Sequence, residues 1–195
     1  MSSLVPMVIK KNIDGSERGM DIYSRLLDDR IIFCTGMIEP EMASSIVAQL
    51  LYLEAEDPNK PISLYISGPG GDVSAGFSII STMNLIKCPV STIIHGTVAS
   101  MSTVIAASGE KGMRYCLPNS EIMIHTASSG SRGKVQDMEI DFLQLQKINE
   151  KVLNHLAKCT NTSITKIKKD CDRDFWLDEN EWKKYGGCDK IIDKR

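Results

Sequence analysis

The sequence predicts an α/β fold with a mostly parallel sheet. Between residues 30 and 125, short β-branched and apolar runs alternate with longer segments that carry apolar residues at helical spacing. This alternation is typical of strands and helices that succeed one another around a parallel sheet. No internal repeat or low-complexity linker divides the 195 residues, a length that suits one core. We therefore expect a single domain over residues 21–195, preceded by a mobile N-terminal segment over residues 1–20.

The elements are expected in order from the apolar pattern and the turn residues between them. Residues 1–20 are polar, with Gly15 and Gly19 in turn signals, so we expect a mobile loop outside the core. Strands are expected at residues 30–35, 62–66, 90–94, 114–117 and 121–125. Helices are expected at residues 21–27, 40–56, 74–86, 101–107, 135–157, 163–170 and 179–184.

Composition and charge exclude several classes of function. The chain has 23 basic and 25 acidic residues, with no basic stripe for nucleic acid or for a membrane surface. No apolar run approaches the roughly 18 residues of a membrane span, and the N-terminus lacks the pattern of a secretory signal. The six cysteines are scattered and form no metal-binding spacing. We expect a cytoplasmic protein with reduced thiols and no metal site.

The stretch from Val90 to Gly109 is the most informative part of the chain. It passes from a β-branched run to a helical run, with Ser100 at the junction. The first amides of a helix lack intrahelical partners, so the amide of Met101 could stabilise an oxyanion while the serine hydroxyl attacks a carbonyl. The alternative is that Ser100 is only an N-cap.

A nucleophilic serine also needs an imidazole base and a carboxylate that orients it. Of the three histidines, His155 is expected to be a solvated helix residue, and His95 lies five residues before Ser100 across a turn. His125 ends a strand that a parallel sheet could bring beside the serine. Spacing alone leaves too many candidates for the carboxylate. The Gly70-Gly71 pair could add a second oxyanion donor, or could be only a tight turn.

Seven tracts, in one order and without an obvious gap from about Val5 to Ile192, resemble a known family. They are DIYSRLL (21–27), VAQLLYLEAEDP (47–58), SGPGGDVSAG (67–76), GTVASMS (96–102), LPNSEIMIH (117–125), CDRDF (171–175) and YGGCDKII (185–192). They resemble the proteolytic subunits of the Clp protease, the ClpP family. Several independent motifs at family spacing make this resemblance far more specific than any single motif.

The resemblance implies roles for individual residues. The family's nucleophile falls on Ser100, its general base on His125 and its triad carboxylate on Asp174. The oxyanion donors fall on the backbone amides of Gly71 and Met101. This assignment agrees with the reasoning from the residues and adds the carboxylate, which that reasoning left open.

The resemblance also implies an architecture and partners. The fold would be the ClpP/crotonase-like fold of repeated ββα-type units, with a handle at about residues 126–158. Two stacked heptameric rings would enclose the sites, with Asp137 and Arg173 paired across the ring–ring contact. Residues near 8–20 would line the axial pores, and residues 1–6 could be a short propeptide. An AAA+ unfoldase would use ATP and deliver unfolded protein substrates, so the subunit itself would need no cofactor.

Five residues match the apolar pockets with which the family docks its ATPase. They are Tyr65, Leu85, Ile93, Tyr115 and Leu117. Ordinary core packing is the alternative for each of them.

The chain departs from the family near the substrate. Residues 126–130 (TASSG) replace the usual Gln-Pro, an apolar residue and two glycines, while Ser102, His95 and Asp72 also differ from the usual residues. We expect a Clp-type serine endopeptidase. One alternative is a weakly active or regulatory ring subunit that works with a second ClpP-type subunit, and another is a crotonase-like acyl-CoA enzyme. Labelling with a fluorophosphonate would distinguish these alternatives.

Overall fold

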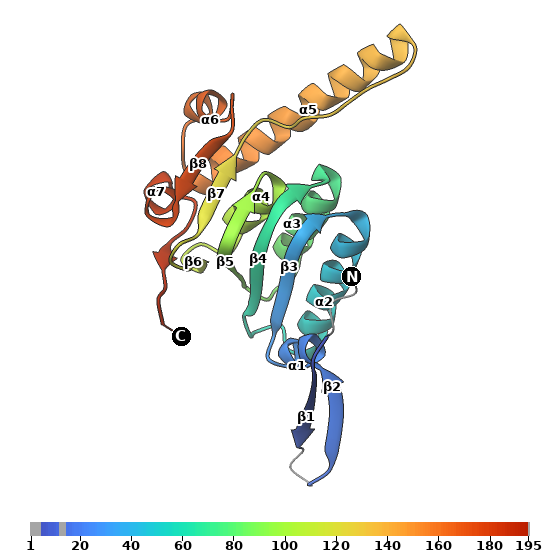
Figure 1. The fold of residues 1–195 in the computed structure, drawn as a ribbon, viewed down its shortest axis with the longest axis vertical. Helices are drawn as coiled ribbons and strands as arrows, with labels where there is room; N and C mark the ends of the chain where they lie inside the picture. Colours follow the sequence, from blue (N-terminus) through green and yellow to red (C-terminus); the bar gives the residue numbers. More distant parts are fainter. Residues whose placement is uncertain (1–4, 12–14, 195) are drawn as a thin grey trace.

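The computed structural model describes residues 5–11 and 15–194, and its centre is a mixed sheet. Strands β3 (Ile31–Ile38), β4 (Ile62–Gly71) and β5 (Val90–Ala99) are neighbours and run parallel (Figure 1). Because helices separate these strands along the chain, each connection is a crossover of the kind that parallel strands require. The predicted α/β fold with a mostly parallel sheet is confirmed.

Strand β5 divides the sheet, because its two halves have different neighbours. Its first half pairs with β6 (Arg114–Cys116), which pairs in turn with β9 (Lys190–Ile191). Its second half pairs with β7 (Glu121–Ile124), and β8 (Phe175–Asp178) adds to β7 in the antiparallel direction. The second half of β5, which leads to Ser100, therefore lies next to the strand that leads to His125.

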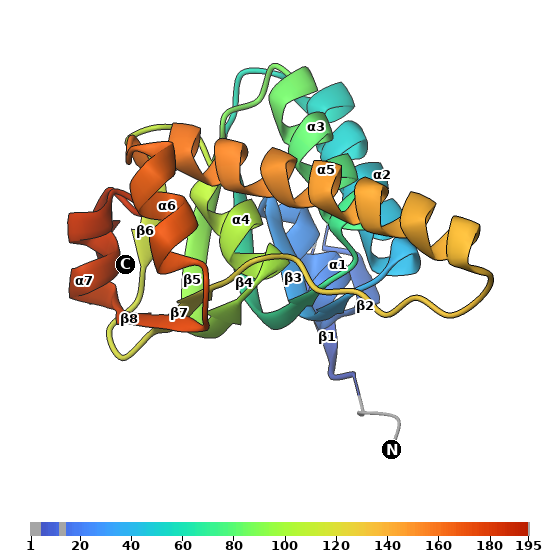
Figure 2. The same ribbon diagram turned by 90° about the horizontal axis from the view of Figure 1, so that it is seen from above.

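Helices cover the sheet and bury its apolar side chains. Figure 2 shows α2 (Pro40–Glu56), α3 (Val73–Leu85) and α5 (Val135–Thr160) on one side of the strands, with α4 (Met101–Ala107) between α5 and the sheet. The shorter helices are α1 (Ile22–Asp28), α6 (Ile164–Asp170) and α7 (Glu179–Tyr185). Fully buried side chains such as Leu64, Ile79 and Ile105 come from strands and helices alike, so one core unites the domain.

Helix α5 has two halves of different character. Its 26 residues extend about 39 Å, and its first half projects beyond the sheet with residues 126–134 beside it (Figures 1 and 2). Val152, Leu153 and Leu156 in the second half are buried, whereas apolar residues of the first half, such as Ile140 and Phe142, are exposed. In the described part of the chain, no helix is both long and apolar enough to cross a membrane.

The structure differs from the sequence prediction at both ends of the chain and in the length of two strands. Strands β4 and β5 continue beyond the expected ends at residues 66 and 94, to Gly71 and Ala99, so His95 lies within a strand and not in a turn. Residues 7–11 and 17–21 form a hairpin, β1 (Met7–Lys11) and β2 (Glu17–Asp21), where a loop was expected. The residues of this hairpin are mostly exposed. A strand that packs against no core needs no alternation of apolar and polar residues, so the sequence pattern does not indicate it. Strands β8 and β9 were also missed, because short strands carry too few residues to show a period. Of the N-terminal segment, residues 1–4 and 12–14 lie outside the described residues.

One ion pair ties the C-terminal part of the chain to the sheet. Arg114 is 6% exposed and donates through Nη2 to Asp189 Oδ1 at 2.5 Å and through Nε to Oδ2 at 3.0 Å. Its Nη1 donates to the carbonyls of Cys159 and Gly186, at the ends of α5 and α7. Burial raises the pKa of Asp189, but the hydrogen bonds and charge of Arg114 outweigh it and hold that pKa below its ordinary value.

We predict that Asp189→Asn lowers the free energy of unfolding by about 3 kcal/mol, because it leaves a buried guanidinium without its counter-charge. The depressed pKa contributes stability above the unfolded value of about 3.9, and this contribution is lost as the pH falls through the folded value. The difference between variant and parent in the free energy of unfolding, measured with urea, should therefore become smaller below about pH 4. Asp193→Asn, at an exposed position, is the control. Equal unfolding of parent and Asp189→Asn at pH 7 would contradict the prediction.

Candidate functional site

Ser100 lies between the end of β5 and the start of α4, in a backbone conformation that is unusual for a side-chain-bearing residue. Its φ is 54° and its ψ is −125°, and a non-glycine residue with positive φ is strained. Its carbonyl accepts from the amide of Thr103 at 3.0 Å, but its hydroxyl makes no capping hydrogen bond. The N-cap alternative therefore does not describe this side chain.

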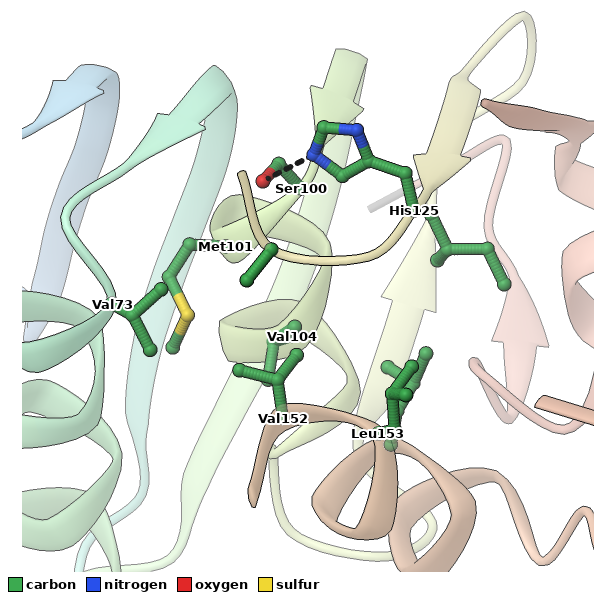
Figure 3. A pocket seen from close by; sticks show the side chains of 10 residues that line it. Val73, Ser100, Met101, Val104, His125, Val152 and Leu153 are labelled. Carbon is green, nitrogen blue, oxygen red and sulfur yellow. Dashed lines mark hydrogen bonds between the residues drawn. The ribbon is translucent and has the colours of Figure 1, made fainter. Parts of the chain in front are cut away.

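The hydroxyl instead joins a chain of hydrogen bonds. His125 Nε2 lies 2.9 Å from Ser100 Oγ, and His125 Nδ1 lies 3.1 Å from Asp174 Oδ1 (the first contact is drawn in Figure 3). The side chain of His125 is 26% exposed and that of Asp174 is 63% exposed. The three groups thus have the order and the spacing that serine nucleophilic catalysis requires, with one side open to solvent.

Strand pairing explains why these residues meet. In the antiparallel pair of β7 and β8, Ile124 lies opposite Phe175, so the next residue of one strand and the previous residue of the other, His125 and Asp174, are directly opposed. In the parallel pair of β5 and β7, the amide of Ser100 donates to the carbonyl of Met123 at 3.0 Å. The sheet therefore sets the positions of all three side chains.

Further hydrogen bonds hold the backbone around the histidine. The hydroxyl of Thr103 donates to the carbonyl of Met123 at 2.8 Å, and the amide of Thr126 donates to the carbonyl of Cys171 at 2.9 Å. Asn149 Oδ1, on α5, accepts from the amide of Ala127 at 3.0 Å. No sequence pattern points to Asn149, because a polar residue in a mostly polar helix carries no signal of this contact.

The Gly70-Gly71 segment passes close to the serine. A Cβ at Gly70, whose φ is 98°, would lie 2.6 Å from Ser100 Cβ and 2.9 Å from the amide nitrogen of Met101. Only glycine allows this approach. Gly71 follows with a φ of 147°, and a Cβ there would lie 2.2 Å from the carbonyl oxygen of Ile38. The glycines thus bring backbone, without side chains, to the edge of the site.

An apolar pocket opens beside Ser100 and His125 (Figure 3). Helices α3, α4 and α5 and strand β7 contribute its walls, and its other lining residues are Val73, Met101, Val104, Ile124, Ala127, Val152, Leu153 and Leu156. Within residues 5–11 and 15–194, no group of three His, Cys, Asp or Glu side chains is placed to hold a metal ion.

The other two histidines lie apart from Ser100. His155 was expected to be solvated, but this expectation is wrong: its Nε2 lies 2.7 Å from Ser108 Oγ, and its ring packs edge-on against Phe77. Burial, together with the nearby lysines, lowers the pKa of His155. The ring of His95 is tilted by 55° against that of Tyr65, with the centroids 6.1 Å apart, and burial lowers the pKa of His95 as well.

The residues expected at assembly contacts have varied positions. Asp137, in the first turn of α5, and Arg173, whose side chain is 94% exposed, both lie at the surface and do not pair with each other in the single chain. Tyr65, Ile93 and Tyr115 form one row across β4, β5 and β6.

The row of Tyr65, Ile93 and Tyr115 extends to Phe33, which is not among the five residues expected to dock the ATPase. Phe33 of β3 is the register partner of Tyr65, and their rings stack at 5.6 Å. Leu117 follows β6, while Leu85 ends α3 and is 77% exposed. Of the five expected docking residues, Ile93 is buried.

Comparisons with known proteins agree with this fold and geometry. The family model described as Clp protease matches residues 14–195. Two relatives named ATP-dependent Clp protease proteolytic subunit, from Streptococcus suis (strain 98HAH33) and Streptococcus mutans serotype c (strain ATCC 700610 / UA159), are each 50% identical over 192 residues, covering 97% of both chains. The chain therefore belongs to the Clp protease family and is a serine peptidase of the ClpP type.

Proposed function

We propose that Ser100, His125 and Asp174 are the catalytic triad of this peptidase. The observation that carries the proposal is the unbroken chain of hydrogen bonds at 2.9 and 3.1 Å from the serine hydroxyl through the imidazole to the carboxylate. Such a chain activates a hydroxyl that is otherwise a weak nucleophile. Peptidases of this family use no cofactor in the proteolytic subunit.

In this mechanism Ser100 Oγ attacks the carbonyl carbon of a peptide bond while His125 Nε2 takes its proton. Asp174 accepts from His125 Nδ1–H, which fixes the tautomer and stabilises the imidazolium. The amides of Gly71 and Met101 donate to the oxyanion that develops. His125 then protonates the leaving amine, and the acyl group on Ser100 is released by a water molecule that His125 activates.

We expect Ser100→Ala to reduce peptide hydrolysis at least about 10³-fold while the chain still folds and assembles, because only the attacking oxygen is removed. A fluorescent fluorophosphonate should label the parent and leave Ser100→Ala unlabelled. Ser81→Ala, at an exposed position of α3, is the matched control. Activity of Ser100→Ala within tenfold of the parent would refute the triad. An unlabelled parent would favour the alternative of a weakly active or regulatory subunit. The hydrogen-bonded geometry of Ser100, His125 and Asp174 argues against that alternative.

Asn149 is proposed to position the backbone that follows His125. Asn149→Leu leaves the amide of Ala127 without its acceptor, at a cost of about 1–3 kcal/mol if that amide stays buried, so kcat should fall about tenfold as the segment rearranges. Asn149→Asp keeps an acceptor oxygen and should retain most of the parent kcat. Asn154→Leu, on the exposed face of the same helix, is the control. Equal losses in Asn149→Asp and Asn149→Leu would contradict a positioning role.

The proposed assembly is two stacked heptameric rings around an enclosed chamber, with α5 and residues 126–134 as the interlocking handle. Exposed apolar side chains on the projecting half of α5, among them Val135, Ile140 and Phe142, support this assignment, because a contact between copies would bury them. The guanidinium of Arg173, beside Asp174, lies 4.0 Å from the exposed carboxylate of Asp172 in the single chain, and it is proposed to pair with Asp137 of a copy in the other ring. Because Arg173 adjoins Asp174, the contact between rings would then help to hold the triad carboxylate in place.

We predict that Arg173→Ala lowers activity and shifts particles from double to single rings, since a charge pair broken from one side costs roughly 3–5 kcal/mol when fully buried. Analytical ultracentrifugation alongside a peptidase assay measures both effects. Lys169→Ala, at an exposed position of α6, controls for the loss of a surface charge. Unchanged double rings with full activity would remove the coupling.

The proposed partner is an AAA+ unfoldase that uses ATP and delivers unfolded proteins to the chamber. Support comes from the name of the two streptococcal relatives, ATP-dependent Clp protease proteolytic subunit, and from the row across β4, β5 and β6 in which Tyr65 and Tyr115 are partly exposed. A cytoplasmic location is proposed because the six cysteines are all free thiols. A second ClpP-type subunit would be a further partner only if the chain by itself turns over peptide poorly.

A further inference from the structure

A groove with a volume of about 390 Å³ runs alongside the pocket at Ser100. It lies between the start of α3, the segment after His125 and the exposed half of α5, and it shares Val73 and Ala127 with the pocket. A peptide whose carbonyl carbon lies at Ser100 Oγ would therefore reach the groove with a side chain of the scissile residue or of a close neighbour, since an extended chain advances about 3.3 Å per residue.

The groove combines apolar walls with two carboxylates. Val73, Leu145 and Ile148 supply apolar surface, while Asp72 and Asp141 supply the charge. Lysine and arginine side chains have this same combination of a long apolar stem and a cationic head. The shape and chemistry of the groove thus match a basic side chain better than a short or an acidic one.

Neither carboxylate has a cationic partner in the described part of the chain. Asp72 Oδ1 accepts from the amide of Ala75 at 2.6 Å as the N-cap of α3, and Asp141 Oδ2 accepts from Ser131 Oγ at 2.6 Å. Each carboxylate is thereby held in place and keeps its second oxygen for a ligand. The lysines of α5, Lys147 and Lys151, border an adjoining hollow that shares Val73, Ser74, Gln144 and Ile148 with the groove. Neither lysine lines the groove itself, and Lys151 Nζ lies over the Phe77 ring, 4.2 Å from its centroid.

We propose that this groove selects a lysine or arginine side chain of the substrate, with Asp72 and Asp141 as the specificity-determining residues. The inference rests on the proposed function, because it takes Ser100 as the point of cleavage. Both carboxylates are exposed, so the selectivity comes from two partly screened charges and is moderate. If each carboxylate contributes about fivefold, the kcat/KM for a basic side chain exceeds that for a neutral isostere by up to roughly 25-fold.

The test uses the full-length assembled protein and short fluorogenic peptides that differ at one position near the scissile bond. Arginine, its neutral isostere citrulline, leucine and glutamate are placed at that position in turn. We expect the ratio of kcat/KM for arginine over citrulline to exceed about fivefold at one position, mainly through KM, and to fall as ionic strength rises.

Two variants remove the charges without removing the hydrogen-bonding shape. Asp72→Asn keeps a good N-cap, and Asp141→Asn keeps an acceptor for Ser131. Each should lower the arginine-to-citrulline ratio about fivefold, and the double variant should bring it close to one. Glu139→Gln, at an exposed position of α5 outside the groove, should leave the ratio at its parent value. A parent ratio near one, or a ratio that both aspartate variants leave unchanged, would overturn the inference.

A binding measurement separates this inference from the proposed function. Fluorescence anisotropy of the same peptides on the Ser100→Ala protein gives an arginine-to-citrulline ratio of dissociation constants that needs no turnover. A ratio above about fivefold that the aspartate variants abolish supports the groove, even if the parent cleaves slowly. Equal binding of arginine and citrulline peptides overturns it, even if the triad assignment holds.

Discussion

The antiparallel pairing of β7 and β8 is the contact on which the site depends. It places the residue after β7, His125, opposite the residue before β8, Asp174. Without this short ladder the carboxylate would lie on a segment with no fixed relation to the histidine. Because β7 also pairs with β5, the same strand orients the imidazole toward the serine hydroxyl. A few backbone hydrogen bonds thus position three side chains from distant parts of the chain.

The strained backbone at Ser100 has a compensating environment. Its positive φ costs of order 1–3 kcal/mol for a residue with a side chain, and the surrounding structure determines it through hydrogen bonds at its amide and its carbonyl. Gly70 approaches from β4 so closely that any side chain there would collide with the serine. The strain turns the hydroxyl away from the helix it precedes and toward the imidazole.

Helix α5 connects the site to the exterior of the fold. Its buried half forms a wall of the apolar pocket, and Asn149 holds the backbone after His125. Its projecting half exposes apolar side chains and contributes Asp141 to the groove. A contact that changes the position of this helix would therefore act on the imidazole and on the substrate groove together.

The sequence by itself determined the alternation of strands and helices, the junction at Ser100 and the set of three candidate histidines, because these depend on local pattern and on residue chemistry. The family motifs added Asp174, which reasoning from spacing had left open. Only the tertiary structure decided that Asp174 lies opposite His125, since β8 is too short to show a period and its pairing joins segments some 50 residues apart in the chain. The same reason applies to Asn149, to the partial burial of His155 and to the two carboxylates of the groove. Each depends on which surfaces the packing of α5 brings together, and no local pattern in the sequence encodes that.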